Sequence, residues 1–224
     1  MNIERDIATL VGVGSSICGG SAIAAAAPVI KASDKDIAQS ISVIFLFNVV
    51  AAFLFPALGD MLGFTDTGFG MWAGTAINDT SSVVAAGQTW ASAHGSDTAL
   101  NYATIVKLTR TLAIIPICLG LAYITSKTKN TAADVKITSI FPMFILYFVM
   151  AAIFNTLAGE SLPVLAQLPS IGKFMIAMAM AAIGLNTNLV SLVKSGGKPI
   201  LLGLVCWIFI ALVSIGMQHV LGIW

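Results

Sequence analysis

The fold of this chain is decided by a stretch of small and hydroxyl-bearing residues that reads Gly74-Thr75-Ala76-Ile77-Asn78-Asp79-Thr80-Ser81-Ser82-Val83-Val84-Ala85-Ala86-Gly87. Sixty positions earlier, the chain reads Gly14-Ser15-Ser16-Ile17-Cys18-Gly19-Gly20-Ser21-Ala22-Ile23-Ala24-Ala25-Ala26-Ala27. The two stretches align without a gap, so that Ile17 pairs with Ile77 and Ser21 with Ser81. An internal repeat in which a glycine and serine break leads into an alanine-rich half-helix is typical of the binding centre of a membrane transporter.

The composition indicates a protein that lies in lipid. Hydrophobic residues make up 58% of the chain and charged residues 9%, and the mean hydropathy is +0.95. A soluble domain has roughly 25% charged residues, so this chain cannot cover itself with polar surface. Its net charge of +1 does not favour nucleic acid as a partner. The odd number of cysteines, all within apolar segments, predicts buried thiols, and we expect neither a metal nor a cofactor.

Seven apolar segments alternate with short polar loops. The segments are 7–30, 37–62, 71–91, 99–125, 137–157, 171–193 and 199–223. The loops rich in Lys and Arg, which we expect on the cytoplasmic side, are 31–36, 126–136 and 194–198. The loops without Lys or Arg, which we expect outside, are 63–70 and 158–170.

Loop charge and segment number conflict at one place. Two apolar segments separate the external loop 63–70 from the cytoplasmic loop 126–136, so one of them must enter and return on the same side. We assign this re-entrant hairpin to 71–91. Segment 7–30 is either a second hairpin, opening to the cytoplasm, or a glycine-rich spanning helix, and we favour the hairpin.

The predicted architecture is an all-α polytopic membrane protein, an inverted-repeat, transporter-like bundle with broken or re-entrant helices. It forms a single transmembrane domain over 1–224, with about five full spans. Its repeat-like units are 7–62 and 71–125, and its carboxy-terminal helices are 137–223.

Hydroxyls beside the predicted breaks are candidate substrate ligands. A half-helix that begins inside the membrane presents unpaired N–H groups and a partial positive charge, which suit an anion. The hydroxyl residues concerned are Ser16, Ser21, Thr75 and Ser81. The alternative is that small residues only allow helices to pack closely. We prefer that alternative for Gly12 and the alanines, and the binding site for the residues around Gly74 and Asp79.

Lys107 and Arg110 are the second component of the candidate site. Arg110 lies about 15 Å along segment 99–125, near the centre of a ~30 Å hydrocarbon core. Two cations there must face protein or water, because each costs roughly 2.5–3.5 kcal/mol in lipid. Asp79 is the expected counter-charge, which leaves about one surplus positive charge for an anionic substrate. The alternative is a purely structural ion pair. Asn186 and Thr187 form a third break, which is either part of a pathway or a cytoplasmic helix end.

These motifs resemble the YeiH family of bacterial inner-membrane proteins, whose members are described as sulfate exporters. The resemblance is carried by the run from Gly14, by Val83-Val84-Ala85-Ala86-Gly87, by Lys107 with Arg110, and by the run 177–185. It implies a multi-pass carrier in the bacterial plasma membrane. The family often has a His-Glu pair where this chain has Asn78-Asp79, so a proton-linked step does not carry over. The chain resembles the carboxy-terminal two-thirds of family members, and we expect it to lack their amino-terminal segments.

The sequence therefore predicts a secondary transporter that exports sulfate or a similar small inorganic anion. Alternatives are a passive anion channel, or a non-transporting subunit or fragment of a larger membrane assembly. An enzyme is not expected, because the sequence lacks a catalytic triad pattern, metal-ligand spacing and a nucleotide loop. The expected partners are the anion and the lipid bilayer, and the sequence leaves a homo-oligomer open.

Overall fold

The computed structural model describes residues 3–129 and 197–224, together with scattered helical positions between them. The described elements are α1 (Arg5–Ser16), α2 (Gly20–Ile30), α3 (Asp34–Leu62), α4 (Asp66–Ala76), α5 (Thr80–His94), α6 (Thr98–Thr111), α7 (Ile114–Lys129) and α12 (Gly197–Leu221). This described part contains helices and no strand, so the all-α prediction is confirmed. Segments 137–157 and 171–193 are described only at scattered positions, and Asn186 and Thr187 lie outside the described residues.

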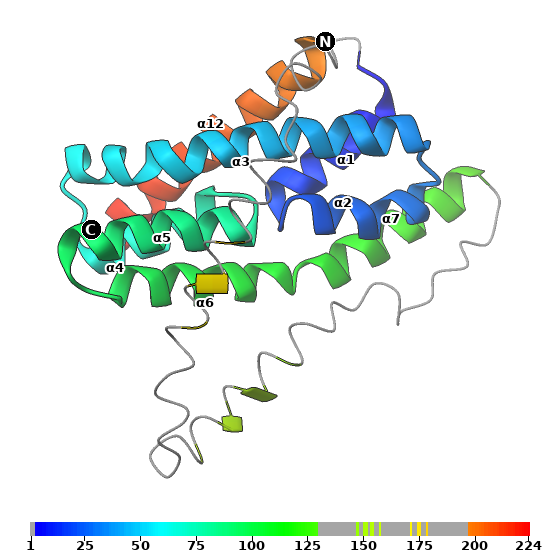
Figure 1. Ribbon diagram of the computed structural model, residues 1–224. Coiled ribbons are helices and arrows are strands. Elements are labelled where there is room, and N and C mark those ends of the chain that lie inside the picture. The colour runs from blue at the N-terminus through cyan, green and yellow to red at the C-terminus, as the bar shows by residue number, and fades with distance from the viewer. Residues whose placement is uncertain are drawn as a thin grey trace.

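Three long helices form the frame of the bundle. Asp34–Leu62, Thr98–Thr125 and Gly197–Leu221 are long and apolar enough to cross a membrane. The second of these comprises α6 and the first part of α7, with a bend at residues 112–113. Pro116 explains the bend, because proline lacks the N–H that a continuous helix would need there. Figure 1 shows α3 and the α6–α7 pair running the length of the molecule on opposite sides of the shorter helices.

The first hairpin consists of α1 and α2, joined by a break at residues 17–19. Gly19 has φ 71° and ψ −131°, a conformation that only glycine adopts without strain. The chain turns back at this point, and α2 packs against α1. Both helices lie in the same half of the bundle, with their joined ends near its middle (Figure 1). Segment 7–30 is therefore a hairpin, as favoured from the sequence, and not a single continuous helix.

The second hairpin consists of α4 and α5, which are joined at Ile77, Asn78 and Asp79. Ile77 is extended, and Asp79 caps α5 by accepting a hydrogen bond from the Ser81 N–H at 3.0 Å. This hairpin opens toward the opposite end of the bundle, so that the two tips meet in the middle (Figure 1). It extends beyond the predicted 71–91 at both ends. It starts at Asp66 because the Thr65 side chain caps α4 by accepting from the Gly68 N–H.

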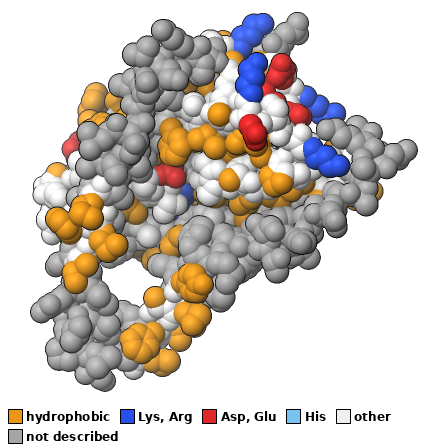
Figure 2. Space-filling model, turned by 45° about the vertical axis from the view of Figure 1, so that its right-hand side comes forward, with side chains coloured by type: hydrophobic (Ala, Val, Ile, Leu, Met, Phe, Trp, Pro, Cys, Tyr) orange, Lys and Arg blue, Asp and Glu red, His pale blue; other side chains and the backbone are white. Residues whose placement is uncertain are grey.

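Charged and aromatic side chains mark the two ends of the bundle. Lys, Arg, Asp and Glu gather at the end formed by the start of α1 and the turn between α2 and α3 (Figure 2). At the opposite end, Trp90 stacks on Phe69 with ring centroids 4.1 Å apart. Trp90 Nε1 also donates to Asp66 Oδ1 at 2.8 Å, and this hydrogen bond lowers the pKa of the Asp66 carboxyl. Both rings are buried, so this stack packs the inside of the bundle at that end.

Glycines let α4 lie directly on α6. A Cβ atom at Gly70 would stand 2.7 Å from the Ala99 carbonyl oxygen, and one at Gly74 would stand 2.7 Å from that of Ala103. These neighbours are backbone atoms, which cannot move aside as a flexible side chain could. Gly74 therefore serves helix packing, and the binding role favoured for the residues around it stays a prediction.

We expect Gly74→Ala to destabilise the protein by about 1–3 kcal/mol, because the added methyl group overpacks a backbone contact. Gly12→Ala is the matched control, since a Cβ atom there meets nothing within 4 Å and alanine favours a helix. Thermal unfolding in detergent, followed by circular dichroism, measures both variants. Equal midpoints for the two variants would contradict this account of the contact between α4 and α6.

Candidate functional site

Lys107 of α6 connects the tips of the two hairpins. Its side chain is fully buried, with 0% exposure. Its Nζ atom donates to the Ile17 carbonyl at 2.7 Å and to the Ile77 carbonyl at 2.9 Å. Ile17 and Ile77 are the equivalent residues of the sequence repeat, and each follows the last residue of its half-helix. One ammonium group therefore bridges the same position in both repeats.

Arg110 makes a second bridge one helical turn further along α6. Its Nη2 atom donates to the Ser15 carbonyl at 2.7 Å, and its Nε atom donates to the Ser16 carbonyl at 2.8 Å. Its Nη1 atom donates to the carbonyl of Thr75, the repeat partner of Ser15. The last carbonyls of a helix have no partner within the helix and carry a partial negative charge. Both cations therefore bind where α1 and α4 end.

This geometry changes the role of two predicted ligands. The Ser16 hydroxyl donates to the Val13 carbonyl at 3.2 Å, and the Thr75 hydroxyl donates to the Met71 carbonyl at 2.7 Å. Both residues lie in the last turns of α1 and α4, and not at the start of the half-helices that follow. They meet Arg110 through their backbone carbonyls.

The predicted ion pair of Asp79 with Lys107 or Arg110 is wrong. Within the described residues, no carboxylate oxygen of Asp79 lies within 4.0 Å of a nitrogen of either cation. The carboxylate instead accepts hydrogen bonds from the N–H and the hydroxyl of Ser81. A residue at a helix start is drawn to the free N–H groups beside it, and here that local contact replaces the longer-range one.

Asn48 is a part of the tips that the sequence analysis missed. It lies in the middle of α3, with 1% exposure. Its Oδ1 atom accepts from the N–H groups of Asn78 at 3.2 Å and Asp79 at 3.1 Å. The available signal was a single amide in the otherwise apolar run 43–55. A buried amide in a membrane helix usually binds a neighbouring helix or a ligand.

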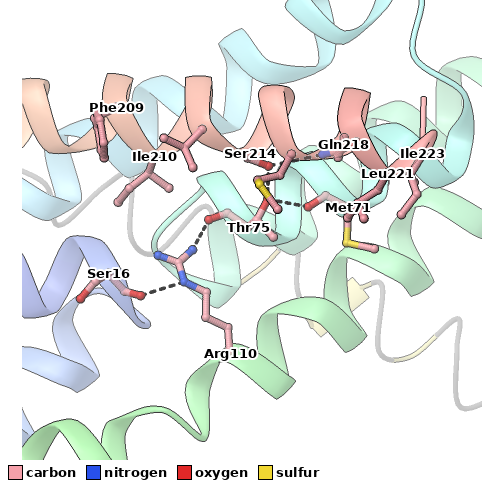
Figure 3. Close-up of a pocket in the computed structure, with 12 residues that line it drawn as sticks. Ser16, Met71, Thr75, Arg110, Phe209, Ile210, Ser214, Gln218, Leu221 and Ile223 are labelled. Carbon is pink, nitrogen blue, oxygen red and sulfur yellow. Dashed lines mark hydrogen bonds between the residues drawn. The ribbon is translucent and has the colours of Figure 1, made fainter.

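A cavity of about 460 Å³ opens beside Arg110. Figure 3 shows Ser16, Thr75 and Arg110 on one side of it and α12 on the other. Ser214 of α12 reaches the tip of the second hairpin, where its Oγ atom lies 2.5 Å from that of Thr75. The sequence analysis had treated 199–223 only as an apolar span, so the polar contribution of α12 was also missed.

The seven candidate residues of the described region fall into two groups. Ser16, Thr75, Lys107 and Arg110 are joined at the ends of α1 and α4. Ser21, Asp79 and Ser81 lie at or beside the starts of α2 and α5. The Ser21 hydroxyl donates to the Cys18 carbonyl at 3.0 Å. The two cations thus bind the carboxy-terminal ends of α1 and α4, where the helix dipole is negative. The other three residues lie at the amino-terminal ends of α2 and α5, where it is positive.

Comparison with known proteins places the chain in a family. A family model described as conserved hypothetical protein 698 matches residues 1–203. A UPF0324 membrane protein of Streptococcus mutans is 60% identical over 99% of this chain and 67% of its own length. The chain belongs to the UPF0324 membrane protein family.

Other UPF0324 proteins show a similar coverage. A relative in Streptococcus pyogenes serotype M6 is 56% identical over 100% of this chain and 68% of its own length. One in Fusobacterium nucleatum is 53% identical, with 100% and 69% covered. The chain thus spans about two thirds of the length of these relatives. Their names identify membrane proteins and state no substrate, and no solved structure matches.

We expect Lys107→Met to lower the stability of this UPF0324 protein by about 1–3 kcal/mol, because the buried Ile17 and Ile77 carbonyls lose their donor. Thr104→Val, on the same helix, is the control. The Thr104 hydroxyl donates only to Leu100 of its own helix, so we expect a loss below about 0.5 kcal/mol. Thermal unfolding in detergent distinguishes the two. If Lys107→Met were as mild as the control, the bridge would not hold the tips together.

Proposed function

We propose that this protein is a secondary transporter that exports sulfate or a similar small inorganic anion across the bacterial plasma membrane. The observation that supports this most is the pair of cations, Lys107 and Arg110, bound to the tips of two opposed hairpins. Both lie deep in the bundle, and neither has a carboxylate within 4.0 Å among the described residues. Ionisable groups at such depth in membrane proteins usually belong to a substrate path.

The charge balance at the tips favours an anion. Each helix end contributes roughly half a charge, negative at the ends of α1 and α4 and positive at the starts of α2 and α5. These four contributions cancel. Lys107 and Arg110 supply two positive charges and Asp79 supplies one negative charge. The surplus of about one positive charge is compensated when an anion binds.

The arrangement of the hairpins suits alternating access. They enter from opposite ends of the bundle and meet in its middle (Figure 1). One hairpin therefore lies between a ligand at the tips and each end of the bundle. In transporters built this way, one unit moves against the rest around a fixed site. The α6 helix carries both cations and packs on α4 and α5, so it joins the site to the second hairpin.

We expect Arg110→Ala to reduce saturable flux of radiolabelled sulfate in proteoliposomes by at least about tenfold, the effect of losing one charged hydrogen-bonding group. Arg5→Ala is the matched control, because Arg5 is exposed at the start of α1 and lies outside the tips. Thermal unfolding of both variants in detergent confirms that they are folded.

Three outcomes would contradict the proposal or refine it. Equal sulfate uptake by empty and protein-bearing vesicles would remove sulfate transport. Flux that rises linearly with sulfate concentration would indicate a passive channel. Equal flux in Arg110→Ala and Arg5→Ala would show that the substrate path does not pass the hairpin tips.

A further inference from the structure

The two hairpins differ at the residue that begins their second helix. Gly19 precedes α2, and its repeat partner Asp79 precedes α5. The Asp79 carboxylate accepts from the Ser81 N–H and hydroxyl. Gly19 has no side chain, and no side chain caps α2. The first N–H group of α2 that donates to a carbonyl of the same helix is that of Ile23, which donates to the Gly19 carbonyl. The N–H groups before it have no partner within the helix.

The uncapped start of α2 faces an amide group without a partner. A Cβ atom at Gly19 would lie 3.5 Å from Asn48 Nδ2 and 3.4 Å from the Asp79 Cβ. Asn48 Nδ2 is buried and has no hydrogen-bond partner. The orientation of this amide is fixed, because Oδ1 already accepts from Asn78 and Asp79. A buried donor left unpaired in a native structure indicates a missing partner such as a water molecule or an ion.

We propose that the start of α2 is the subsite that holds an oxyanion, and this rests on the function proposed above. An oxygen of the anion takes the position that the Asp79 carboxylate has at α5. It accepts from the backbone N–H of Ser21, which is the repeat partner of Ser81, and from Asn48 Nδ2. The second repeat thus contains its own anionic group, and the first repeat receives one from the substrate. Ser21 is exposed and Asn48 is buried, so an ion would enter from the Ser21 side and meet Asn48 at the inner end of the subsite.

The dipole of α2 and the position of Lys107 support the same assignment. The partial positive charge of a helix is concentrated at its first turn, and α2 has 11 residues over which the dipole develops. Lys107 Nζ is bound to Ile17, two residues before Gly19. The positive charge of Lys107 therefore lies beside the start of α2, where it attracts an anion without needing direct contact.

A tethered carboxylate at α2 tests the subsite. Ser21→Asp places a negative group at the second residue of α2. This carboxylate competes with the substrate for the free N–H groups, much as the cap residue Asp79 binds those of α5. We expect sulfate affinity, measured by calorimetric titration of the purified chain in detergent, to fall by at least about tenfold. Ser92→Asp, the same exchange at an exposed position near the end of α5 and away from the tips, should stay within about threefold. Without sulfate, Ser21→Asp should unfold at or above the wild-type midpoint, because an acid at a helix start is stabilising.

Asn48→Asp provides an independent variant. It keeps an oxygen that accepts from Asn78 and Asp79 and replaces only the donor that faces Gly19. We expect a loss of sulfate affinity of at least about tenfold, with the hairpin contact retained. Arg110→Ala serves as the reference variant, because it removes one of the two cations at the hairpin tips and should also lower sulfate affinity.

The outcomes separate this inference from the proposed function. If wild type binds and transports sulfate, and if Ser21→Asp and Asn48→Asp bind it as wild type does, the subsite is overturned and the transporter stands. If both variants lose binding but wild type shows no saturable flux, the subsite stands and transport falls. Failure of the wild-type protein to bind sulfate would overturn both.

Discussion

Two helices that stop in the middle of this bundle leave carbonyl groups that must find hydrogen-bond donors away from water. In lipid, each unsatisfied backbone group costs several kcal/mol. Lys107 and Arg110 satisfy the carbonyls of residues 15–17 and of their partners Thr75 and Ile77. The two cations stand three residues apart on α6, so they face the same side of it. The tips can meet in the middle of the bundle because one helix supplies donors to both.

The helix-end carbonyls also make it possible to bury the two cations in the middle of the bundle. A lysine with 0% exposure would be costly among apolar groups alone, since burial of a charge requires compensating partners. The ends of α1 and α4 provide partial negative charge there without a carboxylate. This removes the need for an Asp79 ion pair and leaves that carboxylate to cap α5. The result is an asymmetric pair of repeats, with Asp79 at one helix start and Gly19 at the other.

Much of this arrangement was predictable from local pattern, and the rest depended on how distant segments meet. The repeat offset and the parity of charged loops predicted both hairpins, and the depth of Lys107 and Arg110 predicted that they face protein or water. The sequence could not show that backbone carbonyls would bind them, because every residue has a carbonyl and only the helix ends leave it free. Asn48 was missed for a related reason. Its partners lie 30 and 31 positions away, and nothing near it in the sequence indicates them.

The number of N–H donors on the two cations limits how many remain to bind an anion once the helix-end carbonyls are satisfied. A lysine ammonium has three N–H donors and an arginine guanidinium has five. Lys107 uses two of its donors on carbonyls and Arg110 uses three, which leaves one and two. A tetrahedral oxyanion has more acceptor sites than these can satisfy. In the proposed transporter the cations would therefore provide charge, while most of the directed hydrogen bonds to an anion would have to come from helix N–H groups. Of the two helix starts at the tips, only that of α2 lacks a carboxylate of its own at the cap.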